Sequence, residues 1–408
     1  MDGINAGDTG FVLIAAAMVM IMTPALGFFY GGLVRKKNVL STLMHSFFTL
    51  CVVSVIWVLW GYTLAFGADK GGLIGSLEHF ALRGIGAEAG PFADNIPAMA
   101  FIAFQMMFAC ITPALITGAF AERISFKTYL LFTVMWVTLV YAPLCHWVWG
   151  GGWIGQYGAL DFAGGTVIHI SSGVAAVVAA RLLGARLDFG TQETEAHDLT
   201  MTVLGASLLW FGWFGFNAGS ALSAGTLAAH AFVVTNVAAA MGGVTWLLIS
   251  WIRQGRPSVA GAACGAIAGL VGITPAAGFV TPTAAIVIGF GAGFLCYFGV
   301  NLLKSVIKLD DALDVFAVHG IGGIWGALAT GLFATTSVNE AGANGLFFGN
   351  PEQLWIQFVA VVAAIAFSAV VTFAILKIVD ALVGLRVVDE DEVLGLDTTQ
   401  HGELAYRL

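Results

Sequence analysis

Long apolar runs recur along the whole chain, and they constrain its fold more than any other feature. An α-helix rises 1.5 Å per residue, so about 20 apolar residues cross a hydrocarbon layer about 30 Å thick. Only 10% of the 408 residues are charged, against about 25% in soluble domains. The short alternating segments of a membrane barrel are absent. The apolar runs lie at residues 11–33, 40–66, 97–120, 128–149, 164–183, 200–221, 227–252, 259–275, 282–303, 314–333 and 354–384.

We therefore expect an all-α integral membrane protein with eleven transmembrane helices. Residues 1–384 would form the transmembrane domain and residues 385–408 a tail. The first apolar run has no basic residue before it, and we interpret it as a retained span. The five cysteines show no paired spacing, so the sequence suggests neither a disulfide framework nor a metal cluster.

The basic residues predict the orientation of these helices. Of the sixteen lysines and arginines, only Lys70 and Arg83 fall in loops on the side where the chain begins. The other fourteen follow the odd-numbered helices or end the chain. By the positive-inside rule the richer side is cytoplasmic. We expect the N-terminus outside and the tail in the cytoplasm.

Two histidines occupy matching positions in two predicted helices. Asp161 precedes His169 by eight residues in "DFAGGTVIHISSG", and Asp311 precedes His319 by the same spacing in "DDALDVFAVHGIGG". Eight helical residues span about 12 Å, so each imidazole lies near the bilayer midplane. The two helices are five spans apart and run in opposite directions. This arrangement predicts an inverted repeat of helices 1–5 and 6–10, with helix 11 added.

The matched pair favours a pathway over simple packing. A single buried histidine is more often a packing residue, but ionisable groups in a membrane are costly and usually face a pathway. Two neutral imidazoles that share one N–H would line a narrow lumen suited to a small polar neutral species, or to a proton. Gly173 and Gly323 follow the histidines by four residues, so neighbouring backbone can approach closely. Asp161 and Asp311 are expected to act first as helix caps.

Aromatic residues cluster near one mouth of the predicted bundle. They come from "AFQMMFA", "CHWVWGGGW" and "FGWFGFNAGS", and comprise Phe104, Phe108, Trp149 and Phe216, together with Ser220. Aromatic faces attract cations by about 0.5–2 kcal/mol each, and a serine hydroxyl adds an acceptor. A cation site is one interpretation. An aromatic belt at the membrane interface is the other.

The chain resembles the ammonium transporter family, which also includes methylammonium permeases and Rhesus proteins. The resemblance extends over nearly the full length and fits the prokaryotic transporter branch better than the Rhesus branch. It rests on segments in family order: "FFYGGLVRKKNVLS", "GAFAERISF", "HWVWGGGW", "DFAGGTVIHISSG", "WFGFNAGS", "GAIAGLVGITPAAG", "DDALDVFAVHGIGGIWG" and "VGLRVVDEDEVLGLDTTQHGELAY".

The resemblance implies roles for the residues of the mouth. Trp149, Phe108 and Ser220 would recruit ammonium or methylammonium, and Phe108 and Phe216 would form a stacked gate. Phe104 would support them. The resemblance also implies a homotrimer in the lipid of the cell membrane, with one pore in each subunit, no cofactor, and no nucleic acid partner.

Within the pore, the resemblance assigns His169 and His319 as the central pair. Asp161 would support recruitment and local structure, and Asp311 would be a further supporting residue. The tail would take part in subunit coupling, and a trimeric PII-type signalling protein would block transport from the cytoplasm.

The charge of ammonium constrains the mechanism. Ammonium, like a lysine amine, is charged at pH 7, and a bare cation meets a large desolvation cost in a narrow apolar pore. We expect a cation to bind at the mouth and release its proton, and neutral ammonia to pass His169 and His319 with net transfer of charge. The alternatives are an electroneutral ammonia channel and a receptor that signals through its tail. An enzyme is not expected, because no nucleophile motif or metal spacing is present.

Overall fold

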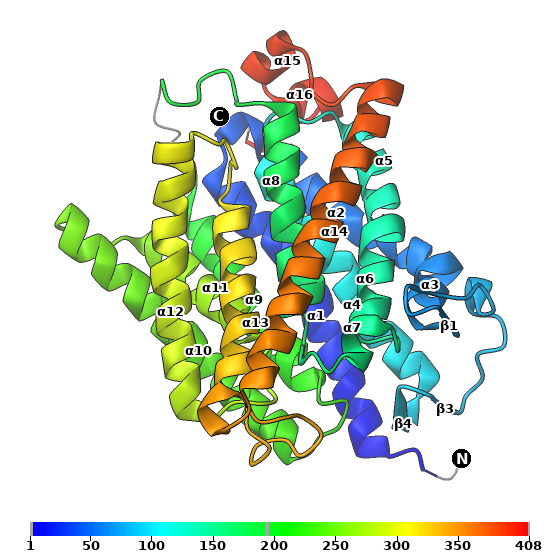
Figure 1. Cartoon of the computed structure of the whole chain (residues 1–408). Helices are drawn as coiled ribbons and strands as arrows, with labels where there is room; N and C mark the ends of the chain where they lie inside the picture. Colours follow the sequence, from blue (N-terminus) through cyan, green and yellow to red (C-terminus); the bar gives the residue numbers. More distant parts are fainter. Residues whose placement is uncertain (1–2, 192–195, 407–408) are drawn as a thin grey trace.

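The computed structural model describes residues 3–191 and 196–406 and is built mainly of helices. Its α-helices are α1 (Ala6–Leu33), α2 (Val39–Ile56), α3 (Tyr62–Phe66), α4 (Ala98–Ile116), α5 (Phe126–Trp136), α6 (Ala142–Val148), α7 (Trp153–Gln156), α8 (Ser171–Leu183), α9 (Leu199–Gly219), α10 (Thr226–Gln254), α11 (Val259–Ile273), α12 (Pro282–Asn301), α13 (Ile321–Phe333), α14 (Pro351–Val383), α15 (Asp389–Leu394) and α16 (Leu396–His401). Long helices stand side by side, and the N-terminus lies at the end opposite α15 and α16 (Figure 1). We call these ends the mouth end and the tail end.

Short π-helical and 3₁₀ segments join several of these helices into longer helical rods. The π-helical turns are η2 (Trp57–Gly61), η5 (Val137–Tyr141), η6 (Gly165–Ile170), η7 (Leu302–Ile307) and η8 (Phe316–Gly320). The 3₁₀ turns are η1 (Lys36–Asn38), η3 (Phe80–Leu82), η4 (Thr117–Phe120) and η9 (Leu346–Phe348). Among the described residues, ten of the resulting rods are long and apolar enough to cross a membrane.

The eighth predicted span differs from the others in length. It forms α11, which has only 15 residues and is therefore about 22 Å long. That is shorter than the hydrocarbon layer. The helix ends two residues before Pro275, which has no N–H to donate to a further helical hydrogen bond. The chain then continues through buried turns to Val280.

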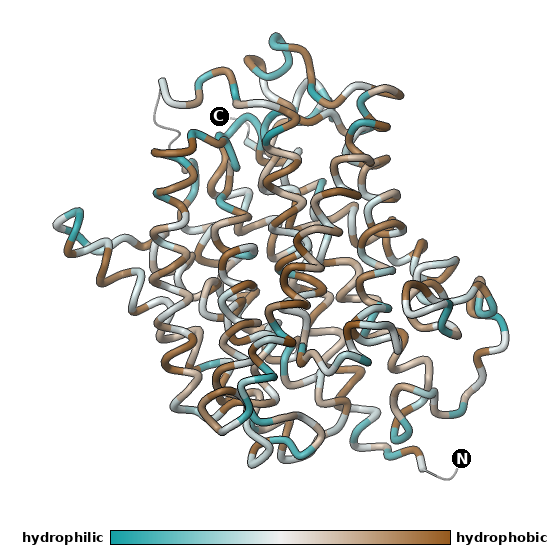
Figure 2. Tube along the Cα trace, viewed as in Figure 1, coloured by the Kyte–Doolittle hydropathy of each residue, from teal (hydrophilic) through white to brown (hydrophobic). Residues whose placement is uncertain are grey.

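The bundle buries its core both between helices that follow one another and between helices that are distant in sequence. Helix α1 packs along α9, α10 packs against α11 and α12, and α14 lies against α5, α8 and α13. Hydrophobic residues fill the middle of the bundle, whereas hydrophilic residues collect toward its two ends (Figure 2). This distribution is the one that a hydrocarbon layer requires.

The two histidine-bearing rods cross closely at the centre of the bundle. Turn η6 packs on α13, and η8 packs on α8. A Cβ atom added to Gly173 would lie 2.3 Å from the backbone nitrogen of Gly320, and one added to Gly323 would lie 3.0 Å from the Gly165 carbonyl oxygen. The close backbone approach predicted from these two glycines is therefore present.

Two small hairpins cover part of the mouth end. The first pairs β1 (Asp69–Lys70) with β2 (Ile74–Gly75), and the second pairs β3 (Ala89–Gly90) with β4 (Ala93–Pro97). The Asn5 backbone N–H donates to the Asn95 carbonyl at 2.8 Å. This bond ties the start of the chain to the second hairpin.

A buried ionic network joins several helices at the tail end. Glu122, whose side chain is fully buried, accepts hydrogen bonds from Arg35, Asn38 and Arg186. Arg186 also forms a two-pronged pair with Asp310 at 2.8 and 2.9 Å. Burial acts to raise the pKa of Glu122, but Arg35 and Arg186 outweigh it and lower that pKa to about 2. The carboxylate therefore stabilises the fold fully above its ordinary pKa of 4.5, and this contribution is lost as pH falls toward 2.

The segment after α14 docks on this network. Gly384 ends α14 in a left-handed conformation, with φ of 73°. Arg386 pairs with Glu392 at 2.6 Å. Asp397 accepts the backbone N–H groups of Leu40 and Ser41 at 3.0 and 2.8 Å, which caps the start of α2. The tail is thus bound to the body of the same chain.

Candidate functional site

A cavity of about 280 Å³ opens at the mouth end, and we call it the mouth cavity. It contains four of the side chains that the sequence placed near one mouth: Phe104, Phe108, Trp149 and Ser220. The remainder of its lining comprises Phe66, Phe92, Phe101, Gln105, Val148, Phe162 and Leu222. Aromatic rings thus form most of the wall, which suits a small cation.

Trp149 and Ser220 are held at the wall by backbone contacts. The Trp149 Nε1–H donates to the Asp161 carbonyl at 2.8 Å, and the indole ring lies 6.0 Å from the Phe108 ring. The Ser220 hydroxyl donates to the Phe216 carbonyl at 2.9 Å. Because its hydrogen is used there, the serine oxygen is left to accept from a bound donor.

Gln105 is a polar wall residue that the sequence analysis did not single out. It lies on α4, is 7% exposed, and its Oε1 atom accepts no hydrogen bond within the described residues. Buried amide oxygens ordinarily find a donor. The available signal was a lone amide in the apolar run "AFQMMFA", directly after Phe104.

Two phenylalanine rings close the floor of the mouth cavity. Phe108 and Phe216 have ring centroids 4.3 Å apart and planes tilted by 40°. The resemblance implies stacked rings, whereas the two planes are tilted within a more crowded cluster. Phe104 meets Phe108 edge-on at 4.8 Å, and Phe216 lies 6.1 Å from the His169 ring below it.

Below this floor, the structure brings His169 and His319 together. Their ring centroids are 5.2 Å apart at an interplanar angle of 20°, and their Nδ1 atoms lie 3.2 Å apart. At that distance one Nδ1 must donate and the other must accept. The Nε2 atom of His169 is buried without a hydrogen-bond partner in the described part of the chain. The imidazole pair therefore retains unused hydrogen-bonding capacity.

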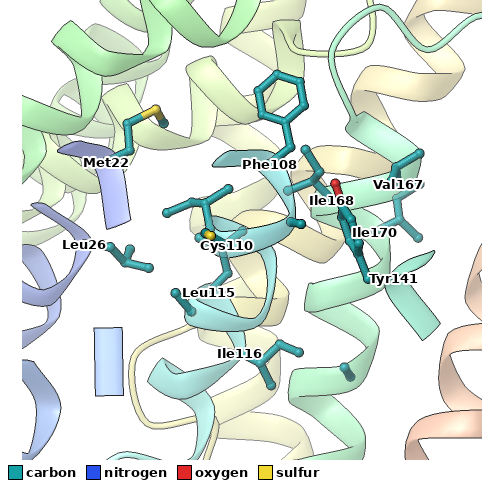
Figure 3. Close-up of a cluster of buried hydrophobic side chains, with 14 of the residues drawn as sticks. Met22, Leu26, Phe108, Cys110, Leu115, Ile116, Tyr141, Val167, Ile168 and Ile170 are labelled. Atoms are coloured by element: carbon teal, nitrogen blue, oxygen red, sulfur yellow. The ribbon is translucent and has the colours of Figure 1, made fainter. Parts of the chain in front are cut away.

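The space around the histidines is small and apolar. It measures about 10 Å³, about what one water-sized molecule needs. Met22, Leu26, Leu115 and Ile168 contribute to its wall, and Figure 3 shows them within the buried apolar cluster. A bare ion would lose its hydration there without replacement.

Asp161 organises the turn that leads into η6. Its two carboxylate oxygens accept the backbone N–H groups of Gly164, Gly165, Thr166 and Val167 at 2.7–3.2 Å. Burial raises the pKa of Asp161, although these four bonds oppose the rise. The side chain is thus a helix-start cap, and its carbonyl also holds Trp149.

Asp311 plays a weaker capping role at the other end of the bundle. One of its oxygens accepts the Phe316 N–H at 2.7 Å, and the other has no partner among the described residues. Burial, with the nearby charge of Asp314, raises the pKa of Asp311 to about 6.

Asp311→Asn should raise the stability of the protein at neutral pH. The carboxyl has a pKa of about 6 in the folded protein against an ordinary 3.8, so ionisation costs the folded state up to about 3 kcal/mol at pH 7. For this group, stability is greatest below pH 3.8 and is lost as pH rises through 6. Asparagine keeps an acceptor for Phe316 and carries no charge. Thermal unfolding in detergent should show a gain that shrinks as pH falls from about 8 to 4, and a pH-independent gain would contradict this account.

The bundle, with ten membrane-length rods among the described residues, is that of a multi-pass helical membrane protein. A family model described as Ammonium Transporter Family matches residues 10–406. The chain belongs to the ammonium transporter family, and this membership supports ammonium transport as its activity.

Individual relatives are similar over nearly their whole length. The ammonium transporter of Bacillus subtilis is 57% identical over 401 residues, which cover 98% of each chain. The crystal structure of Candida albicans Mep2 matches with a TM-score of 0.91 at 38% identity, covering 99% of this chain and 91% of that one. A solved structure described as a sensor Amt protein matches with a TM-score of 0.90 at 30% identity, covering 97% and 98%.

Proposed function

We propose that the protein takes up ammonium by binding the cation in the mouth cavity and passing neutral ammonia along the histidine pair. The proposal rests on the order of the environments between the mouth cavity and the histidine pair. An aromatic cavity lies above two closing rings, and these lie above an apolar space with a paired imidazole. The first environment suits a cation, whereas the last excludes one.

The residues of the mouth cavity have distinct roles in this proposal. Trp149 and Phe108 present ring faces to the cation, and the oxygens of Ser220 and Gln105 accept its N–H groups. Phe108 and Phe216 form the gate that must part for the substrate to move. Phe104 supports the gate by packing on Phe108.

The proton that ammonium releases determines whether charge crosses the membrane. His169 and His319 form a short N···N contact, and a proton can pass between imidazoles that exchange donor and acceptor roles. We propose that this pair relays the proton inward, so that uptake carries current. An electroneutral ammonia channel would return the proton to the outside.

Current recording on purified protein in supported bilayers tests the proposal. Ammonium jumps should produce a saturable inward current in the wild-type protein. In Trp149→Leu combined with Ser220→Ala, the half-saturating concentration should rise about tenfold or more, because a ring face and an acceptor are lost. Methylammonium flux without current indicates an electroneutral channel, and an unchanged concentration dependence contradicts the cation site.

A sensor is the second candidate function. The match to a structure described as a sensor Amt protein favours it. A sensor would bind ammonium and change its tail without transporting. Binding measured by calorimetry, with no methylammonium flux into proteoliposomes, would identify this case.

We further propose the arrangement of the protein in the cell membrane. The mouth end would face outward and the tail end the cytoplasm, following the distribution of basic residues. The reciprocal packing of η6 on α13 and η8 on α8 supports an inverted repeat. A homotrimer would cover exposed apolar residues on α10, including Val244, Leu248 and Trp251, and mass measurement in detergent would test it.

The tail, residues 385–408, would couple the subunits and respond to a PII-type signalling protein. Its support is the docking of Glu392 and Asp397 on the tail end of the bundle. Binding of a purified PII protein should be lost when the chain ends at residue 384. Equal binding by the full and shortened chains would contradict a role for the tail.

A further inference from the structure

A buried histidine beside the mouth cavity takes no part in the pathway described above. His146 lies on α6, and its side chain is fully buried. Its Nδ1 atom lies 2.9 Å from the Ala65 carbonyl oxygen, and its Nε2 atom lies 2.8 Å from Oδ1 of Asp69 on β1. Both ring nitrogens of His146 therefore face oxygen atoms.

These contacts determine how many protons His146 and Asp69 must hold between them. A carbonyl only accepts, so Nδ1 must carry a hydrogen. With a neutral ring, Nε2 would then present a lone pair to the Asp69 carboxylate, and two acceptors would face each other. The hydrogen bond from His146 lowers the pKa of the Asp69 carboxyl. Satisfying both ring nitrogens therefore takes one proton shared between Nε2 of His146 and Oδ1 of Asp69.

The same pair fastens the first hairpin to the turn that carries Trp149. The Trp147 Nε1–H donates to the Leu73 carbonyl at 2.7 Å, and the Trp153 N–H donates to the Gly72 carbonyl at 3.1 Å. These two bonds and the Asp69–His146 bond lie on both sides of Trp149 in the sequence. The hairpin therefore holds both ends of the segment that presents the indole ring.

The backbone of His146 adds a direct connection to that segment. Its carbonyl accepts the N–H groups of Gly150 and Gly152 at 3.0 and 2.9 Å. The backbone at Gly150 is tightly packed, because a Cβ atom added there would lie 1.9 Å from the Ala65 carbonyl oxygen. A shift of His146 is thus transmitted to the turn that begins at Trp149.

We propose that Asp69 and His146 are positioning residues for Trp149, and that they hold the mouth cavity in its cation-binding form only while the pair retains its shared proton. This inference rests on the proposed function of that cavity. The affinity for ammonium then falls as the external pH rises, because loss of the proton turns an attraction into a repulsion. The loop thereby couples outside acidity to capture of the cation.

The charged and titratable groups around His146 are the following. Asp69 is the charged group bonded to His146, and its side chain is 38% exposed, so protons reach it from the mouth end. Lys70, the next residue on β1, is exposed. Helix α3 presents the Ala65 carbonyl, and the neighbouring titratable group on α6 is the buried thiol of Cys145.

Two substitutions of Asp69 separate positioning from bulk structure. Asp69→Ala removes the partner of Nε2 and should raise the half-saturating methylammonium concentration about fivefold to tenfold, with the saturated uptake rate nearly unchanged. Asp69→Asn keeps an oxygen for the Gly72 N–H and turns an amide N–H toward Nε2. A neutral ring can accept that hydrogen, so this variant should retain the wild-type affinity without needing the proton.

The decisive measurement is the half-saturating methylammonium concentration between about pH 5.5 and 8.5 outside, a range in which the amine stays charged. The wild type should weaken as pH rises, and Asp69→Asn should remain constant. Lys70→Ala is the matched control and should follow the wild type. Equal pH profiles for the wild type and Asp69→Asn, or an Asp69→Ala variant with unchanged affinity, overturn the inference.

A second readout keeps this inference separate from the proposed function. Hydrogen exchange of the peptide that contains Gly150 and Gly152 should become faster with pH, beyond the intrinsic rate, in the wild type and not in Asp69→Asn. If this protection changes as expected while methylammonium is not transported, the proposed function fails and the positioning pair stands. If transport occurs and protection is pH-independent, the positioning pair fails.

Discussion

Asp161→Ala should abolish methylammonium uptake and lower the free energy of unfolding by at least about 3 kcal/mol. The carboxylate accepts four buried backbone N–H groups at the start of η6, and alanine leaves all four without an acceptor. The turn also carries the carbonyl that holds the Trp149 indole. Both the entry to the histidine-bearing rod and the wall of the mouth cavity are therefore disturbed.

Uptake into proteoliposomes and denaturant unfolding in detergent would measure the two effects. Asp198→Ala provides a graded control, because that side chain caps α9 at a less buried site and accepts one backbone N–H of the helix, from Met201 at 2.9 Å. It should cost only about 1 kcal/mol and leave uptake intact. Equal losses for the two variants would show that the four bonds of Asp161 contribute no more than an ordinary cap.

Glu122→Ala should destabilise the tail end of the bundle by about 3–5 kcal/mol, because it removes the buried carboxylate that Arg35 and Arg186 share. Glu122 pairs with Arg186 on one oxygen and with Arg35 and Asn38 on the other. Asn38 in turn accepts the Leu396 N–H of the tail at 2.9 Å. The loss should therefore also loosen the tail.

Thermal unfolding and limited proteolysis of the tail would measure this prediction. Glu122 has a φ of 72°, so alanine also changes the backbone preference at a left-handed position. Glu122→Gln keeps a long non-glycine side chain at this backbone position, but it turns an amide donor toward an arginine. This variant should still lose much of the stability. Glu340→Ala, at an exposed residue, is the neutral control. A tail that resists protease equally in all variants would contradict the coupling.

Periodicity and spacing predicted much of the framework because hydrocarbon imposes a simple rule on the chain. Ten of the eleven predicted spans correspond to membrane-length helical rods in the described residues. The exception, α11, is shortened by Pro275, and hydropathy does not register the loss of a backbone donor. The equal spacing of Asp161–His169 and Asp311–His319 placed both rings at one depth, and the glycines that follow them indicated close crossing.

The geometry of the site could not be predicted from sequence spacing in the same way. Spacing along a helix cannot give the 3.2 Å between two Nδ1 atoms, or the tilt between Phe108 and Phe216, because each depends on packing from distant helices. Gln105 was overlooked because one polar residue in an apolar run has no periodic signal. His146 gave no signal in the sequence, since its partner Asp69 lies 77 positions earlier, in a loop without recognisable pattern.

The sequence by itself determined that this chain forms a bundle of apolar helices, which family it resembles, and which two histidines occupy matching positions in it. These properties depend on local composition and on the fixed rise of a helix. Only the tertiary structure decided which of the buried polar groups meet. Three such contacts join Asp161 to a backbone turn, Glu122 to two arginines, and His146 to a hairpin. Buried polar groups need partners once water is excluded, and folding in three dimensions supplies them.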